Sequence, residues 1–262
     1  MSFFSIITVC LNSGDNLKNT VNSILTQENA DFELIIKDGG SNDNSLDQIP
    51  LDNRIKLIIS VDSGIYDAMN QALSYAAGEY ILFLNSGDYF YDRFVLDSFY
   101  NSITNNDFPG LIYCDYTTTG LGEYVQSPLK LTKFFLFRTM LCHQVCMIKK
   151  ELYDRIGNFN TDYRVDADYD FLLRLLLENK TSYHHIQTLG VISTSEGFSF
   201  QNNTLAKQEV LQIRKKYYRH TYLSYAFLLS LTFPSLREKL FRSTNLVSRL
   251  YQRFVNVINR LL

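Results

Sequence analysis

Residues 32–41 read Phe-Glu-Leu-Ile-Ile-Lys-Asp-Gly-Gly-Ser, an apolar run that ends in an acid and two glycines. The same order of apolar run, polar side chain and glycine recurs at 5–14, 56–64 and 80–88. Short apolar runs bounded in this way are typical of buried strands. Helical patterns separate them, at 15–27, 44–48 and 65–77. This alternation predicts an α/β fold built from right-handed βαβ units, with a mostly parallel sheet covered on both faces.

The side chains that follow the four runs are predicted to meet at one edge of the sheet. Ligands of such sheets bind beyond the carboxyl ends of the strands, where glycine lets the backbone approach closely. The four loops are Asn12-Ser13-Gly14, Asp38-Gly39-Gly40-Ser41, Asp62-Ser63-Gly64 and Asn85-Ser86-Gly87-Asp88. We therefore expect these loops to form a ligand site together.

The second half of the chain is less regular. It contains strand-like runs at 111–116, 123–126 and 145–149, and an amphipathic helical pattern at 168–178. A composition of 46% hydrophobic and 20% charged residues is that of a globular protein. The four cysteines form no paired framework, and the amino terminus lacks the pattern of a signal peptide. These features predict a cytoplasmic protein.

Charge is distributed unevenly along the chain. Residues 207–262 carry eleven Lys and Arg against two acids, a net charge of +9, whereas the remainder carries −11. Basic residues interleaved with Tyr, Phe and Leu predict contact with an anionic membrane surface and not with nucleic acid. The apolar stretch at 222–233 is shorter than the roughly 20 residues that span a bilayer. We expect a basic amphipathic helical extension at 206–262, peripheral on the inner face of the cytoplasmic membrane.

Five motifs follow one another along the chain. They are Ser-Ile-Ile-Thr-Val at 5–9, Asp-Gly-Gly-Ser-Asn-Asp at 38–43, Asp-Ser-Gly-Ile-Tyr-Asp-Ala-Met-Asn at 62–70, Gly-Glu-Tyr-Ile-Leu-Phe-Leu-Asn-Ser-Gly-Asp at 78–88 and Asp-Tyr-Asp-Phe at 168–171. Together, over roughly residues 3–200, the chain resembles glycosyltransferase family 2, and more narrowly the enzymes of colanic acid and O-antigen biosynthesis. The resemblance implies a GT-A fold, a Rossmann-like nucleotide-binding mixed sheet flanked by helices. It further implies a catalytic domain at 1–205, with a nucleotide-sugar half at about 1–115 and an acceptor half at about 116–205.

The activity that the resemblance implies is inverting sugar transfer, of hexosyl type, from a nucleoside-diphosphate sugar. We expect a UDP-hexose or UDP-N-acetylhexosamine, with GDP-fucose as the main rival. The expected acceptor is a lipid-linked saccharide in the synthesis of a bacterial surface polysaccharide such as lipopolysaccharide O-antigen, capsule or exopolysaccharide. One alternative is a sugar-1-phosphate nucleotidyltransferase, but residues 12–16 lack the basic phosphate loop of that class. A non-catalytic sugar-nucleotide-binding or membrane scaffold protein is the other.

Donor contacts are implied for residues at the strand ends. The carboxylate that Asp38 matches contacts the base or ribose in the family, although Asp-Gly-Gly is also a typical start of an Asx-turn. Asp62 is open to a second interpretation, as a cap of the following helix. The predicted donor-binding residues are Thr8, Val9, Asn12, Asp38, Asp62, Asn70, Asn85 and Ser86.

Asp88 is the predicted ligand of Mg²⁺ or Mn²⁺. A cation held by a carboxylate neutralises charge on the departing diphosphate. The commoner family pattern is Asp-x-Asp-Asp, whereas this chain has Asn85 and Gly87 in place of the first two acids. We therefore expect donor phosphates and water to complete the coordination, and Asn85 to bond the ribose. A solvated turn is the alternative role for Asp88.

Inversion requires a base for the acceptor hydroxyl, and the resemblance assigns this role to Asp168. Asp166 and Asp170 are its rivals, and a helix N-cap is the structural alternative. On a helix Asp168 and Asp170 point about 200° apart, so only one of that pair faces the site. The predicted substrate residues are Tyr66, Asp67, His143, Gln144 and Asp166. For His143, a place in the core is the alternative.

Overall fold

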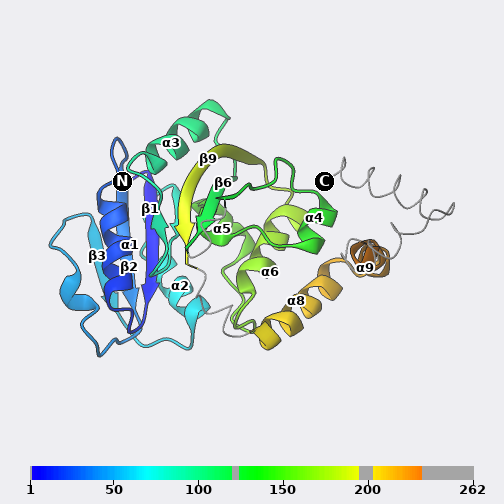
Figure 1. Ribbon diagram of the computed structural model, residues 1–262, viewed down its shortest axis with the longest axis horizontal. Coiled ribbons are helices and arrows are strands. Elements are labelled where there is room, and N and C mark those ends of the chain that lie inside the picture. Colours follow the sequence, from blue (N-terminus) through cyan, green and yellow to red (C-terminus); the bar gives the residue numbers. More distant parts are fainter. Residues whose placement is uncertain (1, 120–123, 195–202, 232–262) are drawn as a thin grey trace. The chain divides into compact units, whose positions relative to one another are not determined.

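The chain folds as two compact units in a computed structural model that describes residues 2–119, 124–194 and 203–231 (Figure 1). The first unit comprises Met1–Ser127 and Leu141–Glu209. The second comprises Pro128–Met140 and the described residues from Val210 onward. It therefore includes a segment from inside the predicted acceptor half. The functional division at about 115 and 205 stays a prediction.

A mixed sheet forms the centre of the first unit. Its parallel part contains, in spatial order, β3 (Ile55–Ile59), β2 (Phe32–Asp38), β1 (Phe4–Cys10) and β4 (Tyr80–Phe83). The sheet continues from β4 through β8 (Cys146–Lys149), β6 (Leu111–Thr118), β9 (Tyr183–Ser193) and β5 (Tyr89–Phe90), while β7 (Tyr124–Val125) pairs with β6. Strand β8 is antiparallel to both β4 and β6, and β9 is parallel to β6. The α/β class is confirmed, and the predicted parallel pairing holds for the first four strands.

Helices flank this sheet. Those of the first unit are α1 (Asp15–Leu25), α2 (Ile65–Leu73), α3 (Val95–Asn105), α5 (Lys150–Ile156) and α6 (Ala167–Leu173). Every residue of β1 and β2 is buried, which accounts for their largely apolar sequence. Helix α1 buries Leu17, Val21 and Ile24, at the four- and three-residue spacing of an amphipathic helix. Helix α2 packs against β1 and β2.

Several predicted boundaries differ from those observed. The pattern at 44–48 forms only a 3₁₀ turn, η1 (Leu46–Gln48), because the polar groups of the loop bond one another, as the Ser45 backbone N–H and hydroxyl do with Asp43 Oδ1. Helix α2 ends at Leu73 and not at 77. The predicted helix at 168–178 is α6 followed by a π-helical turn, η3 (Arg174–Glu178). Helices α3 and α5 were not predicted.

The second unit is helical in the part that the structure describes. It contains α4 (Lys133–Arg138), α9 (Tyr222–Leu231) and the end of α8 (Asn203–Tyr217). The Phe137 ring makes edge contacts with Tyr218, Tyr222 and Tyr225, and the Arg214 guanidinium lies 5.1 Å from its centroid. None of the described helices has the length and apolar character that crossing a membrane requires. The predicted extension beyond 231 lies outside the described residues.

The buried parallel strands are expected to dominate stability. Ile6 of β1 is fully buried, so Ile6→Ala should lower the free energy of unfolding by about 2–5 kcal/mol. Ile59 on the edge strand β3 is 60% exposed, and Ile59→Ala should change that free energy by less than about 0.5 kcal/mol. Urea unfolding of both variants measures the difference. Equal losses in the two would contradict the assigned core.

Candidate functional site

The loops after β1 and β2 are tied together by hydrogen bonds. Asn12 donates its backbone N–H to Ser41 Oγ at 2.8 Å and accepts from the Asn42 backbone N–H at 2.9 Å. Asp38 accepts from the backbone N–H groups of Gly40 and Ser41, both at 2.8 Å. Burial alone would raise the pKa of Asp38, but bonds from Ser41, Gly40 and Cys10 hold it below its usual value. Asp38 therefore lies in the Asx-type turn that the sequence left open, and a nucleotide contact stays a prediction.

Lys37 is a buried cation that sequence reasoning missed. Its ammonium has no exposed surface, pairs with the Asp62 carboxylate and donates to the Ser60 carbonyl at 2.7 Å. Asp62 also accepts from the Gly64 backbone N–H at 3.1 Å, at the start of α2. A buried charge requires a partner. A lysine that directly follows the apolar run 34–36 in a buried strand was the available signal for this pair.

Other predicted donor and substrate residues support the scaffold. Thr8 donates to the Leu84 carbonyl at 2.8 Å, and Asn70 exchanges two bonds with the Phe159 backbone at 2.9 and 3.0 Å. Asp67 accepts from the Ser63 backbone N–H at 2.8 Å, and Val9 is buried. The Ser86 hydroxyl is buried without a hydrogen-bond partner among the described residues. For all five, a role in binding stays a prediction.

Asp88 lies at the carboxyl end of β4, behind a turn that Gly87 makes with a φ of 102°. That angle favours glycine. Asp88 is 4% exposed. Its carboxylate accepts from the Thr194 backbone N–H at 2.8 Å and from Gln144 Nε2 at 3.0 Å. Burial raises its pKa despite these bonds. Asp88 is therefore a fixed, buried acid and not the solvated turn residue of the alternative.

His143 and Asp168 form a close pair. His143 Nδ1 lies 2.9 Å from Asp168 Oδ2. The other oxygen, Oδ1, accepts from the Tyr169 backbone N–H at 2.9 Å and lies 2.9 Å from the Tyr66 hydroxyl. That hydroxyl also lies 2.6 Å from the Val165 carbonyl, so its one proton is shared between two acceptors. Three predicted residues, Tyr66, His143 and Asp168, thus meet in one cluster.

The 3₁₀ turn η2 (His143–Val145) joins this cluster to Asp88. His143 Nε2 lies 3.3 Å from the Asn85 side-chain nitrogen, while the neighbouring Gln144 donates to Asp88. Cys142 Sγ donates to Gln144 Oε1 at 2.9 Å, which fixes the orientation of the amide. The predicted metal ligand and the predicted base are therefore linked through two consecutive residues.

Glu209 holds the loop that leads into α6. Its carboxylate accepts from the backbone N–H groups of Arg164, Val165 and Asp166, at 2.9, 2.9 and 3.0 Å. Asp166 is 8% exposed and immediately precedes α6. The sequence gave no signal for this anchor, because Glu209 occurs in a basic segment far along the chain. Asp170, the other rival base, pairs with Arg174 at 3.0 Å.

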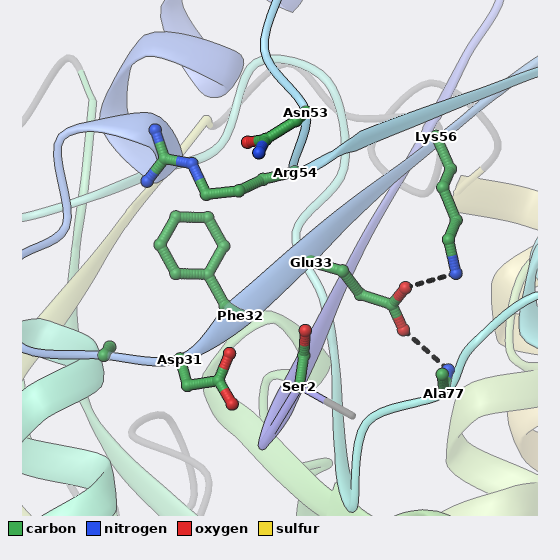
Figure 2. Close-up of a pocket in the computed structure, with 9 residues that line it drawn as sticks. Ser2, Asp31, Phe32, Glu33, Asn53, Arg54, Lys56 and Ala77 are labelled. Carbon is green, nitrogen blue, oxygen red and sulfur yellow. Dashed lines mark hydrogen bonds and ion pairs between the residues drawn. The ribbon is translucent and has the colours of Figure 1, made fainter.

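A hollow also lies at the amino ends of the strands (Figure 2). Phe32, the first residue of β2, and Ala77, just before β4, contribute to its lining. Its basic groups are paired with acids, since Lys56 bonds Glu33 at 2.6 Å and Arg54 bonds Asp52 at 2.7 Å. We therefore place the site at the carboxyl ends, where the loops converge.

Comparisons with known proteins identify the family and the fold of the chain. The sequence profile of Glycosyl transferase family 2 matches residues 5–156. A PGL/p-HBAD biosynthesis glycosyltransferase of Mycobacterium bovis is 32% identical over 216 residues, which cover 80% of this chain and 82% of the relative. Staphylococcus aureus TarS 1–349 in complex with UDP-GlcNAc superposes with a TM-score of 0.64, at 17% identity over 85% of this chain and 75% of TarS.

A second solved structure shows the same fold. The mannosyltransferase PcManGT of Pyrobaculum calidifontis, in complex with GDP-Man and Mn²⁺, has a TM-score of 0.63 at 16% identity, covering 98% of this chain and 80% of that protein. These likenesses confirm the GT-A fold.

Asp168 is expected to control the titration of His143. Burial alone would lower the pKa of His143, but the bond and charge of Asp168 and the charge of Asp88 raise it above 6.5. Asp168→Asn should therefore move this pKa downward, as measured by NMR titration of the imidazole against the other histidines. Because the folded-state pKa is raised, the pair stabilises the fold below the unfolded value of about 6.5, and this stabilisation is lost as pH rises through the folded pKa. An unchanged His143 titration would contradict the pairing.

Proposed function

The chain belongs to glycosyl transferase family 2, and we propose that it transfers a hexosyl group with inversion from a nucleoside-diphosphate sugar to a lipid-linked saccharide. The product would be part of a bacterial surface polysaccharide such as O-antigen, capsule or exopolysaccharide. The observation that carries this proposal is the linked pair of sites around η2. Asp88 is suited to the leaving-group side and the His143–Asp168 pair to the acceptor side.

A UDP-hexose or UDP-N-acetylhexosamine is the donor that we propose. TarS, which shares the fold, binds UDP-GlcNAc, and PcManGT binds GDP-Man, so a GDP-sugar is the rival. The loops after β1 and β2 would hold the nucleotide. Their backbone is already fixed by the Asn12 and Asp38 bonds, so little ordering would be needed on binding.

Asp88 fits the role of a single protein ligand to Mg²⁺ or Mn²⁺. The described residues contain no group of three or more His, Cys, Asp or Glu that could hold a metal by themselves. Asp88 Oδ1 already accepts from Ser193 and Thr194, whereas Oδ2 accepts from Gln144 and keeps a lone pair. Burial of this carboxylate without a cation is unfavourable. When bound, the cation would neutralise charge on the departing diphosphate. Gln144 would keep the carboxylate aimed at it.

The first prediction of this proposal concerns Asp88 and donor turnover. Profiling UDP-, GDP- and dTDP-sugars with Mg²⁺ or Mn²⁺ should identify one donor class that the protein hydrolyses or transfers. Asp88→Asn should cut this turnover by about a thousandfold, because the leaving diphosphate loses several kcal/mol of stabilisation. Asp97→Asn, which removes an acid of α3 that bonds Asn101, is the matched control and should have little effect.

Other outcomes would favour the alternatives. Donor binding without any turnover would favour the scaffold protein. Formation of a nucleoside-diphosphate sugar from a nucleoside triphosphate and a sugar 1-phosphate would favour the nucleotidyltransferase. Near-normal turnover of Asp88→Asn would remove Asp88 from the site.

The basic carboxyl-terminal segment is proposed to bind the inner face of the cytoplasmic membrane. Six basic residues lie beyond 231, and each basic residue near an anionic surface contributes about 1 kcal/mol to binding. Replacing Arg237, Lys239, Arg242, Arg249, Arg253 and Arg260 by Gln should strongly reduce sedimentation with anionic vesicles. Neutral phosphatidylcholine vesicles provide the control. Binding that survives all six changes would reject the tether.

A further inference from the structure

We propose that α4 and the residues around it, the segment 128–140, bind an anionic lipid surface through Leu129, Lys130 and Lys133. This inference rests on the proposed function, because it names a contact with the membrane that would hold the lipid-linked acceptor. It concerns residues in the middle of the chain, whereas the proposed tether concerns residues beyond 231. The two contacts can therefore be tested separately.

The fold separates charge more completely than the order of residues along the chain does. The segment 128–140 is far from the carboxyl-terminal segment in sequence, yet it packs as part of the second unit. The described residues of that unit carry seven Lys and Arg and no acid. The first unit carries 12 Lys and Arg against 26 acids. A unit with charges of one sign repels itself and attracts an anionic partner.

Helix α4 is fixed within the second unit on its apolar side. Phe137 is 1% exposed, and the Arg138 carbonyl accepts from Arg214 Nη2 at 2.9 Å. Thr132 caps the helix, since its hydroxyl accepts from the Phe135 backbone N–H at 3.0 Å. The helix also packs against α9. The segment is therefore an ordered part of the unit whose inner side is already covered.

The residues that precede and begin α4 are exposed. Leu129 is 61% exposed, and Lys130 and Lys133 are exposed close to it in the sequence. On α9 of the same unit, Leu223 is 81% exposed. Apolar side chains interleaved with cations are typical of segments that lie in the interface of an anionic bilayer. The leucine would enter the acyl boundary, while the ammonium groups stay among the headgroups.

A lipid surface fits these residues better than the alternatives do. Protein–protein interfaces are depleted in Lys relative to the rest of a protein surface. A face that meets only solvent usually mixes both signs of charge, which limits its self-repulsion. Lysine suits a lipid surface because its apolar stem lies along hydrocarbon while its ammonium group reaches the phosphates.

The position of the segment along the chain relates it to the acceptor. Met140 is its last residue, and η2 begins three residues later, at His143. Gln144 of the same turn donates to Asp88, and His143 contacts Asp168. A membrane contact at α4 would therefore hold the stretch of chain that leads directly into the candidate site. A lipid-linked acceptor has to be reached from that same membrane surface.

Tryptophan fluorescence provides the first test, because the chain contains no Trp. In the full chain carrying Leu129→Trp, vesicles of phosphatidylglycerol and phosphatidylcholine should shift the emission to shorter wavelength and protect the indole from acrylamide. Leu51→Trp, at a fully exposed position of the first unit, is the matched control and should show neither change. Vesicles of phosphatidylcholine alone should leave the emission of both variants unchanged.

Removal of the two lysines provides the second test. Lys130→Gln with Lys133→Gln should weaken partition onto the anionic vesicles about thirtyfold, because each basic residue near the surface contributes about fivefold. Lys18→Gln with Lys180→Gln removes the same charge from exposed positions of the first unit and should have little effect. An unchanged thermal unfolding midpoint verifies that each variant is folded.

Three results would overturn the inference. Unshifted emission of Leu129→Trp in protein that sediments with the vesicles would assign Leu129 to a protein partner and confine the lipid contact to other residues. Equal weakening by the two pairs of lysine changes would show that only net charge matters. Failure of the wild-type protein to bind anionic vesicles would refute this contact and the tether together. The proposed glycosyl transfer is tested by donor turnover, which none of these results measures.

Discussion

The contact between His143 Nδ1 and Asp168, at 2.9 Å, is the interaction on which the site depends. A carboxylate as buried as Asp168 is tolerated only when donors surround it, and each donor comes from a different part of the chain. Tyr66 is contributed by α2, Tyr169 by α6 and His143 by η2. The need to satisfy one acid therefore fixes the relative positions of the segments that would receive donor and acceptor.

The departure from the family's acidic motif is compensated locally. With Asn85 and Gly87 in place of two acids, Asp88 keeps the carboxylate, and Gln144 holds it from the facing turn. Asn85 contacts His143 by its side-chain nitrogen, an approach that a carboxylate at this position would make as an acceptor instead. The substitution thus replaces a group that can only accept by an amide that can also donate to the imidazole.

The sequence predicted the parts of the fold that follow from local pattern. Continuous apolar runs located β1 to β4, and the glycine-containing loops after them correctly indicated one edge of the sheet. The family resemblance predicted Tyr66, His143 and Asp168 as site residues, but it did not predict the hydrogen bonds among them. Thr8 and Asn70 show why, since a polar residue at a strand end can equally bond the backbone. Glu209 shows the same limit, because its three partners lie more than forty residues away.

Glu209 also limits where the carboxyl-terminal segment can be changed without loss of the loop before α6. Helix α8 runs without interruption from Asn203 to Tyr217, and Glu209 is the last residue of the first unit. The carboxyl-terminal segment is therefore expected to tolerate exchange or shortening only beyond this glutamate. A junction placed earlier would remove the anchor of the loop before α6 along with the tail. The boundary between the first unit and the carboxyl-terminal segment therefore lies inside a helix, where no linker marks it.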